Sequence, residues 1–562
     1  MFTSQLLHLK SHIQLPKSHI AIILLIYTAL SLYQLNLPGL HYDEAFEAVP
    51  AVQLLYDQPV TAFRNSGLWL GGRLFPLMTQ DYIGAINTYT TLPLIALLGP
   101  TPIALRLIPV LAGALTVWLV YALARALTGN SKVGLVAALF LAVDPTFIFW
   151  NRQGVFVTAV LAPIGLAAAL SWLKRWQTGS RGWAVTGAFL LGLGLYAKLL
   201  FLWLIAALVG SVILLNLFRL KSWTMELWHT TNVREIGLMV LAFLAGCWPL
   251  LLYNLQTGGT FINISQNAQT SYYGVDNAAI GPNLLTRLGQ LGVMLNGGHL
   301  WYLGKVMQNW TGVILLGILL ILVIITIRKN STPLPTPLPP FKVALFPMLV
   351  IGLVILFSVA TVSALWVTHF AILMPWPALA LAVGGWYLSR LPLPIMPKLK
   401  QSALWGAVLL LTLTSLLTTL RYHRSLTESG GLSTHSDAVY DLSLWLADNA
   451  RGPVIAMDWG LAAPVTYLTG GRVTPVEIFG YGWQPTPQLT DHLADIIAQR
   501  EALYLWRAPD EIIFDRSREF KNLYRPLNLE ENIEAAFYEH SGRPLLGVTR
   551  LVPKGAAENP PQ

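Results

Sequence analysis

The sequence is poor in charged residues and contains a single cysteine. Only 11% of its 562 residues are Asp, Glu, Lys or Arg, and 54% are hydrophobic, whereas charged residues make up roughly a quarter of a soluble domain. This shortage excludes an ordinary soluble domain and indicates a protein that crosses a membrane several times. Cys247 lies within an apolar run, so an intrachain disulfide and a cysteine-based metal site are both excluded.

The charge is also distributed unevenly along the chain. The net charge is +9, yet 25 basic and 9 acidic residues precede residue 425, whereas 11 basic and 18 acidic residues follow it. We therefore divide the chain into a basic membrane body, residues 1–424, and an acidic tail, residues 425–562. Most of the basic excess falls on one side of the expected membrane, so it does not indicate binding to nucleic acid.

The membrane body contains about eleven apolar stretches of the length that a spanning helix needs, about 20 residues. The polar segment LHYDEAFEA follows the first of them, with no small-residue cleavage site, so we expect a retained helix rather than a removed signal peptide. The stretches cover about residues 18–36, 102–124, 133–150, 154–173, 183–197, 199–217, 236–253, 311–327, 343–365, 367–389 and 402–420.

Basic residues near the ends of these stretches predict the orientation. Sixteen fall in the segments on one side, and seven fall in the longer segments on the other. The positive-inside rule then places the N-terminus and the Pro-rich linker STPLPTPLPP in the cytoplasm, and the tail outside the plasma membrane. Two outer segments are long, about 37–101 and 254–310, and long ordered loops usually carry function.

The tail differs from the body in its pattern. Charge occurs throughout it, and short apolar runs such as PVIAM alternate with helical patterns such as DAVYDLSLWLADNA. This pattern predicts a small α/β domain outside the membrane. The tail shows no Gly-rich phosphate loop, metal-ligand spacing or nucleophile elbow, so we expect a structural or acceptor-docking role. The expected fold is an all-α polytopic membrane protein followed by this small domain.

Acidic residues are scarce in the body, and Asp43, Glu44 and Glu47 lie within five positions just after the first stretch. They could simply be solvated residues flanking an amphipathic helix that begins near Asp43. Ionisable groups at membrane depth, however, mark a pathway or a site by default, although a single cation can also snorkel to the headgroups, which suits Arg106 better than Lys198. Five further ionisable residues, each costly to place beside or inside an apolar run, map to the same outer face: Arg106, Asp144, Arg152, Lys198 and His369.

A carboxylate that faces cations at the outer leaflet suits the transfer of a group from a lipid phosphate to a hydroxyl or an amine. The leaving phosphate needs fixed positive charge, which Arg and Lys supply. The weakly acidic acceptor needs a general base, which an Asp supplies. A donor that arrives as a lipid requires no nucleotide-binding loop.

At these residues the chain resembles a known family. The segments HYDEAFEA, ALRLIPVLAG, NRQG, GLGLYAK and THFAILMPWPALAL, in order over about residues 18–390, are similar to type C membrane glycosyltransferases. The nearest group comprises protein O-mannosyltransferases and aminoarabinose transferases, which use polyprenyl-phosphate sugars. The resemblance implies that Asp43 activates the acceptor in a single inverting displacement and that Glu44 shapes the site. It also implies that Arg152 and Lys198 hold the lipid phosphate, for which Arg106 and His369 are the next candidates.

The chain departs from the family after Arg152, where GVFVTAV lacks the acidic residue that many relatives carry, although Asp144 is nearby. The first loop also lacks an Asp-x-Asp motif, so we expect no metal and no other cofactor. If a divalent cation were used, His41 and His299 would be the candidate ligands.

Two other classes of function fit part of the pattern. A secondary transporter or lipid flippase would also have many spans and intramembrane charge, but transporters usually show internal repeats with a site near the midplane, and we find no repeat. The chain could also be a non-catalytic partner in glycan assembly that works through its tail. The sugar stays open, and the acceptor could be a protein, a glycolipid or a growing glycan.

Overall fold

The structure is a computed structural model. It describes the chain in these ranges: 18–153, 158–222, 224–225, 231–327, 339–391, 396–479, 494–497, 499 and 501–555. The first seventeen residues, most of the Pro-rich linker and the beginning of GVFVTAV lie outside the described residues.

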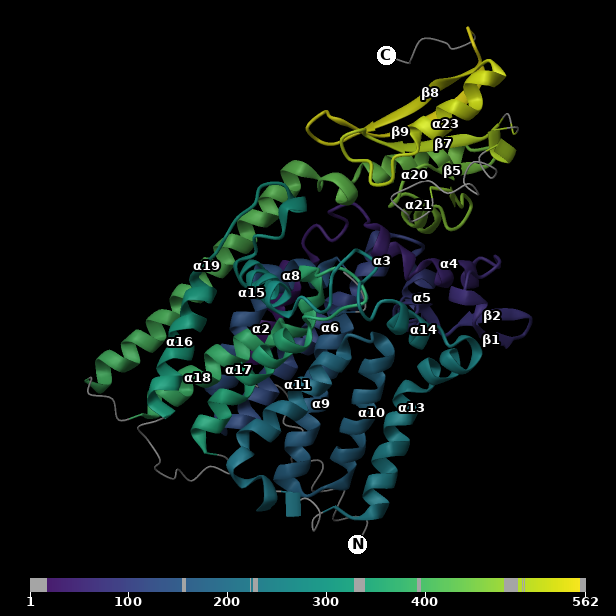
Figure 1. Ribbon diagram of the computed structural model, residues 1–562. Helices are drawn as coiled ribbons and strands as arrows, with labels where there is room; N and C mark the ends of the chain where they lie inside the picture. The colour runs from purple at the N-terminus through teal and green to yellow at the C-terminus, as the bar shows by residue number, and fades with distance from the viewer. Residues whose placement is uncertain are drawn as a thin grey trace.

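The body is a bundle of apolar helices (Figure 1). Among the described residues, four helices are long and apolar enough to cross a membrane, or six if each of two bent pairs counts as one span, and four more apolar helices are shorter. The expectation of about eleven spans therefore stays a prediction. The helices of the bundle are α2 (Ser18–Leu32), α6 (Pro102–Thr128), α7 (Ser131–Ala142), α8 (Pro145–Arg152), α9 (Thr158–Thr178), α10 (Arg181–Ala197), α11 (Phe201–Leu215), α13 (Val233–Thr257), α16 (Thr311–Ile327), α17 (Pro340–Phe357), α18 (Pro375–Arg390) and α19 (Pro397–Ser429).

The single span expected at 133–150 is broken in the structure. Helices α7 and α8 meet at an angle of 64°. The cause is local, because Asp144 caps α8 by accepting a hydrogen bond from the backbone N–H of Phe147, and Pro145 begins the new helix. A proline has no backbone N–H to continue the preceding helix and is favoured in the first turn of the next one.

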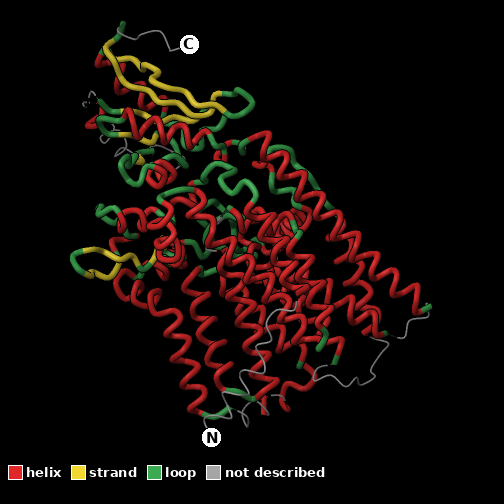
Figure 2. The backbone as a smooth tube through the Cα atoms, turned by 180° about the vertical axis from the view of Figure 1, so that it is seen from behind, coloured by secondary structure: helices red, strands yellow, loops and turns green. Residues whose placement is uncertain are grey.

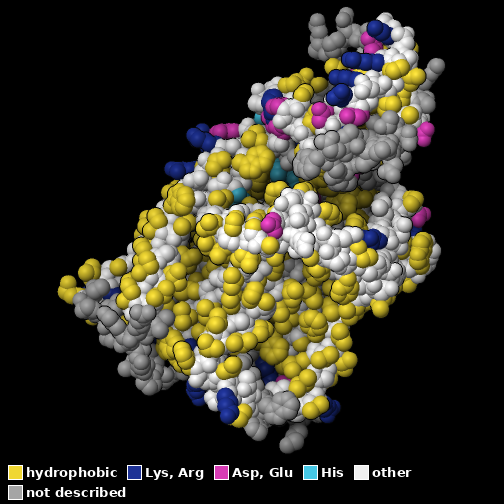
Figure 3. Space-filling model, in the orientation of Figure 1, with side chains coloured by type: hydrophobic (Ala, Val, Ile, Leu, Met, Phe, Trp, Pro, Cys, Tyr) yellow, Lys and Arg dark blue, Asp and Glu magenta, His cyan; other side chains and the backbone are white. Residues whose placement is uncertain are grey.

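The outer surface of the bundle is apolar. In Figure 3, hydrophobic side chains cover the flank of the bundle, and charged side chains gather toward its two ends. Large side chains on this surface are well exposed, for example Leu241 at 65%, Ile321 at 59% and Leu409 at 60%. A contiguous apolar surface of this extent is unfavourable in water and fits the hydrocarbon core of a bilayer, as expected for a multi-pass membrane protein.

The first long outer segment folds between α2 and α6. Two short helices replace the single helix that the sequence suggested from Asp43 onward, because Pro50 in the first turn of α4 cannot continue α3. The elements are α3 (Tyr42–Phe46), α4 (Val49–Leu55), η1 (Phe63–Asn65), β1 (Gly67–Leu70), β2 (Arg73–Pro76), β3 (Met78–Gln80), β4 (Ile83–Gly84) and α5 (Ile86–Leu98). The second long outer segment contains α14 (Gly259–Gln266), α15 (Ile280–Asn296) and η3 (Trp301–Leu303).

The C-terminal part contains a five-stranded mixed sheet in the order β6-β5-β7-β9-β8. Strand β5 pairs in parallel with β6 and β7, and β9 pairs antiparallel with β7 and β8. The sheet lies beyond one end of the bundle, on the side of α3 and α4 (Figures 1 and 2). Its elements are α20 (Ala438–Asn449), β5 (Val454–Ala456), α21 (Ala462–Leu468), β6 (Val476–Glu477), β7 (Leu503–Arg507), α23 (Ser517–Tyr524), β8 (Leu529–Tyr538) and β9 (Pro544–Pro553).

The C-terminal part shares a hydrophobic core with the first outer segment. Leu40 and Val52 belong to the same cluster of buried residues as Leu442, Val465 and Leu503. Helix α19 also continues to Ser429, past the boundary at residue 425 that the change in charge suggested. The tail is therefore packed directly onto the segment that contains Asp43 and Glu44.

Candidate active site

Helix α3 holds the two adjacent carboxylates and begins with a capping box. The Nδ1 atom of His41 accepts a hydrogen bond from the backbone N–H of Asp43 at 3.2 Å, and the Glu44 carboxylate accepts one from the backbone N–H of His41 at 3.1 Å. Such reciprocal bonds satisfy donors that a helix N-terminus leaves unpaired. Asp43 and Glu44 are thereby fixed in the first turn, where the helix dipole favours negative charge.

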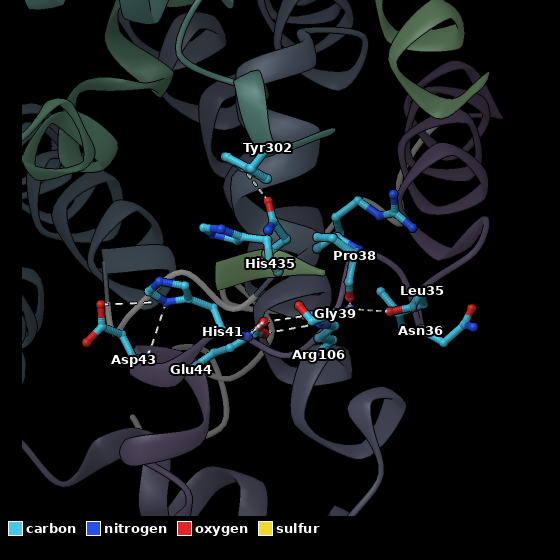
Figure 4. A network of polar contacts seen from close by, with 12 residues as sticks. Leu35, Asn36, Pro38, Gly39, His41, Asp43, Glu44, Arg106, Tyr302 and His435 are labelled. Carbon is cyan, nitrogen blue, oxygen red and sulfur yellow. Dashed lines mark hydrogen bonds and ion pairs between the residues drawn. The ribbon is translucent and has the colours of Figure 1, made fainter. Parts of the chain in front are cut away.

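Glu44 forms a buried ion pair with Arg106, drawn in Figure 4. The Nη2 atom of Arg106 lies 2.6 Å from Oε1 and its Nε atom 3.1 Å from Oε2. The remaining guanidinium N–H groups donate to the carbonyl oxygens of Leu35, Pro38 and Gly39 at 2.9–3.3 Å. All five donors of Arg106 are thus used, and its side chain is 0% exposed. Arg106 neither snorkels nor has a donor left for a phosphate; it holds the turn before α3.

Asp43 points away from Arg106 toward His41 (Figure 4). Its Oδ2 atom lies 3.6 Å from Nδ1 of His41, and its side chain is 32% exposed. Burial raises the pKa of the Asp43 carboxyl, while the charges of His41 and Lys198 act in the opposite direction. A carboxylate with a raised pKa that can still be reached is suited to accept a proton from an acceptor hydroxyl or amine.

Lys198 lies at the turn between α10 and α11, where the first outer segment holds it. Ile83 forms an antiparallel bridge with Lys198, and the backbone N–H of Leu199 donates to the carbonyl of Tyr82 at 2.9 Å. The Lys198 side chain is 7% exposed. Burial lowers the pKa of Lys198, and the carboxylates of Glu47 and Asp43 are close enough to oppose that shift. The structure therefore brings Lys198 and Asp43 within range of each other's charge, although they are 155 positions apart in the sequence.

His369 joins this site together with Arg287, a residue that the sequence analysis did not select. Nδ1 of His369, in η4 (Val367–Leu373), lies 3.4 Å from Nη2 of Arg287 on α15. Arg287 is fully buried and lies over the rings of Trp203 and Phe370, at 5.6 and 5.2 Å. Among the described residues no carboxylate forms an ion pair with it. His369 is also close enough to Lys198 for their charges to interact.

These interactions define a group of cationic and imidazole side chains, Lys198, Arg287 and His369, of which Lys198 is close enough to Asp43 for their charges to interact. We call it the cation group. A buried guanidinium without a carboxylate partner favours an anionic ligand, because an uncompensated buried charge is costly. This applies to Arg287, whose N–H groups also donate to the carbonyls of Ser358 and Trp366 and to Oε1 of Gln290, and it applies equally to buried Arg152. The only sequence signal for Arg287 was a lone arginine in a long outer segment, where it counted as one of the seven basic residues of the outer face.

Arg152 lies elsewhere, beneath the turn that precedes α3. Its Nε atom donates to the carbonyl of Ser31 at 3.3 Å, its Nη2 atom donates to the carbonyls of Tyr33 and Gln34, and its guanidinium lies 5.3 Å from the ring centroid of Phe149. These contacts tie Arg152 to the end of α2. The Nη1 atom of Arg152 is buried and has no hydrogen-bond partner among the described residues, so the role in phosphate binding that the family resemblance implied for Arg152 stays a prediction.

The remaining candidates are also dispersed. Asp144 caps α8 and faces a separate cavity of about 50 Å³ that Met294 and Ser415 also line, so it does not supply a second carboxylate beside Asp43. His299 packs against Trp150, with ring centroids 4.6 Å apart, rather than against His41. Across the described part of the chain, no three His, Cys, Asp or Glu residues are grouped so as to hold a metal ion.

One protein family matches part of the chain. Residues 89–253 match the family model described as dolichyl-phosphate-mannose-protein mannosyltransferase. This region includes Lys198 but not Asp43. No curated protein matches the chain in sequence.

Solved structures share the fold over nearly the whole chain. ArnT from Cupriavidus metallidurans bound to undecaprenyl phosphate has a TM-score of 0.59 at 13% identity, with 94% of this chain and 97% of that chain covered. Its apo state has a TM-score of 0.60 at the same identity and coverage. An oligosaccharyltransferase from Archaeoglobus fulgidus has a TM-score of 0.50 at 12% identity, covering 93% of this chain and 72% of that one. The resemblance to type C membrane glycosyltransferases of the mannosyltransferase and ArnT group is thus confirmed.

Proposed function

We propose that the chain is an integral-membrane glycosyltransferase that moves a sugar from a polyprenyl-phosphate donor to an acceptor at the outer face of the membrane. One observation carries the proposal: Asp43 and Lys198 are close enough for their charges to interact, within a fold shared with a protein that was crystallised with undecaprenyl phosphate. A general base and a cation that binds the phosphate are the two groups that this transfer requires in one site.

The reaction follows from these two groups. The acceptor hydroxyl or amine gives its proton to the Asp43 carboxylate as its oxygen or nitrogen bonds to the anomeric carbon. The bond from that carbon to the phosphate oxygen breaks on the opposite face, and the polyprenyl phosphate leaves with the electron pair. Charge grows on the leaving oxygen as the bond breaks, so the fixed charge of Lys198 stabilises the transition state more than the ground state. The anomeric configuration is inverted.

The geometry favours a revised set of phosphate-binding residues. Arg287 and His369 are in contact, and Lys198 is close enough to His369 for their charges to interact, whereas Arg106 uses all its donors on Glu44 and on backbone carbonyls before α3, and Arg152 contacts the end of α2. We assign the phosphate to the cation group and give Glu44 a structural role through its pair with Arg106. No cofactor is required by this chemistry.

The acceptor side faces the C-terminal part. A cavity of about 280 Å³ lies between the short helices α3 and α4 and helix α21. Its wall is mostly apolar, with Tyr42 and Phe46 from α3 and with Thr466 and Glu477 from the C-terminal part. Its lining suits part of a protein, glycolipid or glycan acceptor, and Tyr42 in its wall is the neighbour of Asp43 in the sequence.

Turnover of lipid-linked sugars tests the proposal. Purified protein in detergent is given a panel of undecaprenyl-phosphate hexoses and pentoses with candidate acceptors, and released undecaprenyl phosphate is measured by mass spectrometry. Wild type should release it, and Asp43→Asn should lose about 100- to 10,000-fold of the rate, the usual contribution of a general base. Asp57→Asn is the matched control, because Asp57 lies in the same outer segment but is 81% exposed.

Three outcomes would contradict the assignment. Equal turnover by wild type and Asp43→Asn would remove Asp43 as the base. Transport of the lipid without transfer of the sugar would favour a flippase or secondary transporter. If cells that lack the protein lose a glycan, and expression of Asp43→Asn restores that glycan, the protein would instead be a non-catalytic partner in glycan assembly.

A further inference from the structure

Three aromatic rings are stacked beside α3, which holds Asp43 and which we call the catalytic helix. The His41 ring stacks on His435 with centroids 4.3 Å apart and planes inclined by 20°. The other face of His435 stacks on Tyr302, at 4.1 Å and 16°. Trp459 meets His41 edge-on at 5.6 Å. Figure 4 shows His41, His435 and Tyr302 above α3 and the Glu44–Arg106 pair.

The stack joins segments that are far apart along the chain. His41 caps α3, and Tyr302 belongs to η3 in the second long outer segment. His435 ends η5 (Ser433–His435), which leads from α19 into the C-terminal part. The ring of His435 thus contacts the residue that caps α3 from the C-terminal part, as Trp459 also does.

The neighbouring backbone contacts hold His435 in this place. The backbone N–H of Leu432 donates to the carbonyl of Tyr302 at 2.9 Å. The hydroxyl of Tyr440 donates to the carbonyl of Asn36 at 2.6 Å, in the turn before α3. The backbone approaches so closely at Gly39 that an added Cβ atom would lie 2.0 Å from the carbonyl oxygen of Ser436. The segment from Leu432 to Tyr440 is thus packed tightly against this turn.

The orientation of His41 bears directly on Asp43. Nδ1 of His41 accepts the backbone N–H of Asp43 and lies 3.6 Å from its Oδ2 atom. A tilt of the imidazole ring would therefore move both the first turn of α3 and the environment of the carboxylate. His435 covers one face of this ring and Trp459 meets it edge-on, so the ring has little freedom to tilt.

We propose that His435 is a positioning residue, through which the C-terminal part orients Asp43 by fixing the ring of His41. This inference rests on the proposed function for its catalytic consequence. It gives the C-terminal part a role in the transfer reaction itself, besides any contact with the acceptor. Through the stack, the position of the C-terminal part would determine the orientation of the Asp43 carboxylate.

Two substitutions separate the role of the ring from general folding. His435→Ala removes both stacking contacts and should lower kcat about tenfold. A tenfold change in rate corresponds to about 1.4 kcal/mol in the barrier, and one aromatic pair contributes up to about that much. The donor KM and the affinity for undecaprenyl phosphate should stay within about twofold, because the cation group is untouched. His435→Phe keeps a flat ring and should restore most of kcat. His540→Ala is the control, since His540 lies in the same C-terminal part but outside the stack, paired with Asp437.

Hydrogen–deuterium exchange of the full-length protein gives a second measurement that needs no turnover. His435→Ala should increase deuterium uptake in the peptide that covers residues 40–48, with uptake in the bundle helices unchanged. His435→Phe and His540→Ala should match wild type in this peptide.

The two measurements distinguish the possible failures. If wild type turns over no lipid-linked sugar, the proposed function fails, and the exchange data still decide whether His435 orders α3. The positioning role is overturned if His435→Ala leaves the 40–48 peptide or kcat unchanged. It is also overturned if His435→Phe behaves like His435→Ala, or if KM rises as much as kcat falls.

Discussion

Glu44 and Arg106 form a buried, bidentate ion pair in which both side chains are almost fully excluded from solvent, at 2% and 0% exposure. The pair gives the adjacent carboxylates on α3 different surroundings. Glu44 is bound by the guanidinium that also holds the preceding turn, whereas Asp43 faces His41 and Lys198. Two neighbouring acids thus become one structural group and one candidate base.

Removing one partner of this pair should destabilise the protein. Arg106→Gln leaves the Glu44 carboxylate buried without its partner, and loss of one member of a buried ion pair typically costs about 3–5 kcal/mol. Thermal unfolding in detergent measures the loss. Arg73→Gln is the control: Arg73 and Asp57 form an exposed pair, at 47% and 81% exposure, which typically contributes at most about 1 kcal/mol. Equal stability of Arg106→Gln and Arg73→Gln would contradict the structural role of Arg106.

The cation group predicts which arginine acts on the lipid phosphate. Lys198→Ala and Arg287→Gln should each lower turnover about 100- to 1,000-fold, because loss of one charge-stabilising donor typically costs about 2.7–4 kcal/mol. Steady-state turnover of the lipid-linked sugar measures this, with Lys305→Ala as the control because Lys305 is an exposed lysine of the outer segment. Normal turnover in Arg287→Gln together with a large loss in Arg152→Gln would restore the assignment that the family resemblance implied.

The pH dependence of kcat should be bell-shaped. Burial raises the pKa of Asp43 above its ordinary value of 3.8, and a base must be ionised, so turnover should fall as the pH drops through this raised pKa. Burial lowers the pKa of Lys198 from 10.5, and Lys198 must be protonated to hold the phosphate, so turnover should fall again as the pH rises through that lowered pKa. Lys198→Arg should remove the alkaline limb only, because arginine stays charged. An alkaline limb that persists in Lys198→Arg would show that another group causes it.

The orientation in the membrane is open to a direct test. Ser541 lies in an exposed turn between β8 and β9, and Ser180 lies in the exposed turn between α9 and α10. Each is replaced by cysteine in a separate variant. We expect a membrane-impermeant maleimide to label Ser541→Cys in intact cells and Ser180→Cys only after permeabilisation, with buried Cys247 as the unlabelled background. The opposite pattern would reverse the predicted sidedness.

Several features of the site were predictable from the sequence because they are local or compositional. Asp43 and Lys198 stood out because charged residues are scarce in an apolar body, and a buried charge must have a reason. The contact between Arg287 and His369 was not predictable in the same way. Arg287 is a lone arginine in a long segment, and only the long-range packing of α15 against η4 places it beside His369.

For the fold, too, local features were predictable from the sequence and long-range contacts were not. The apolar stretches predicted where helices occur, but the break at Pro145 and the split between α3 and α4 depend on caps and prolines within those stretches. The change in charge near residue 425 marked a change of structure. It could not show that Leu442 and Leu503 of the tail share a core with Leu40, because core membership depends on contacts between segments about 400 positions apart.

The close contact at Gly39 predicts a final effect that links the C-terminal part to the site. An alanine there would place its Cβ atom 2.0 Å from the carbonyl oxygen of Ser436, a backbone atom that cannot move aside alone. Gly39→Ala should therefore push the segment containing His435 away from α3 and cost about 1–3 kcal/mol, as overpacking of a well-packed region does. Turnover should fall more than stability alone explains, because Asp43 lies four residues further on in the same segment.

Thermal unfolding and turnover of Gly39→Ala are compared with those of Gly237→Ala. Gly237 lies within α13 with open space around its Cβ position, so its replacement should be neutral or slightly stabilising, since alanine is the better helix former. Hydrogen–deuterium exchange should show greater uptake in residues 40–48 for Gly39→Ala and not for Gly237→Ala. If Gly39→Ala instead retains wild-type turnover and exchange, the C-terminal part does not need this close approach to hold the catalytic helix.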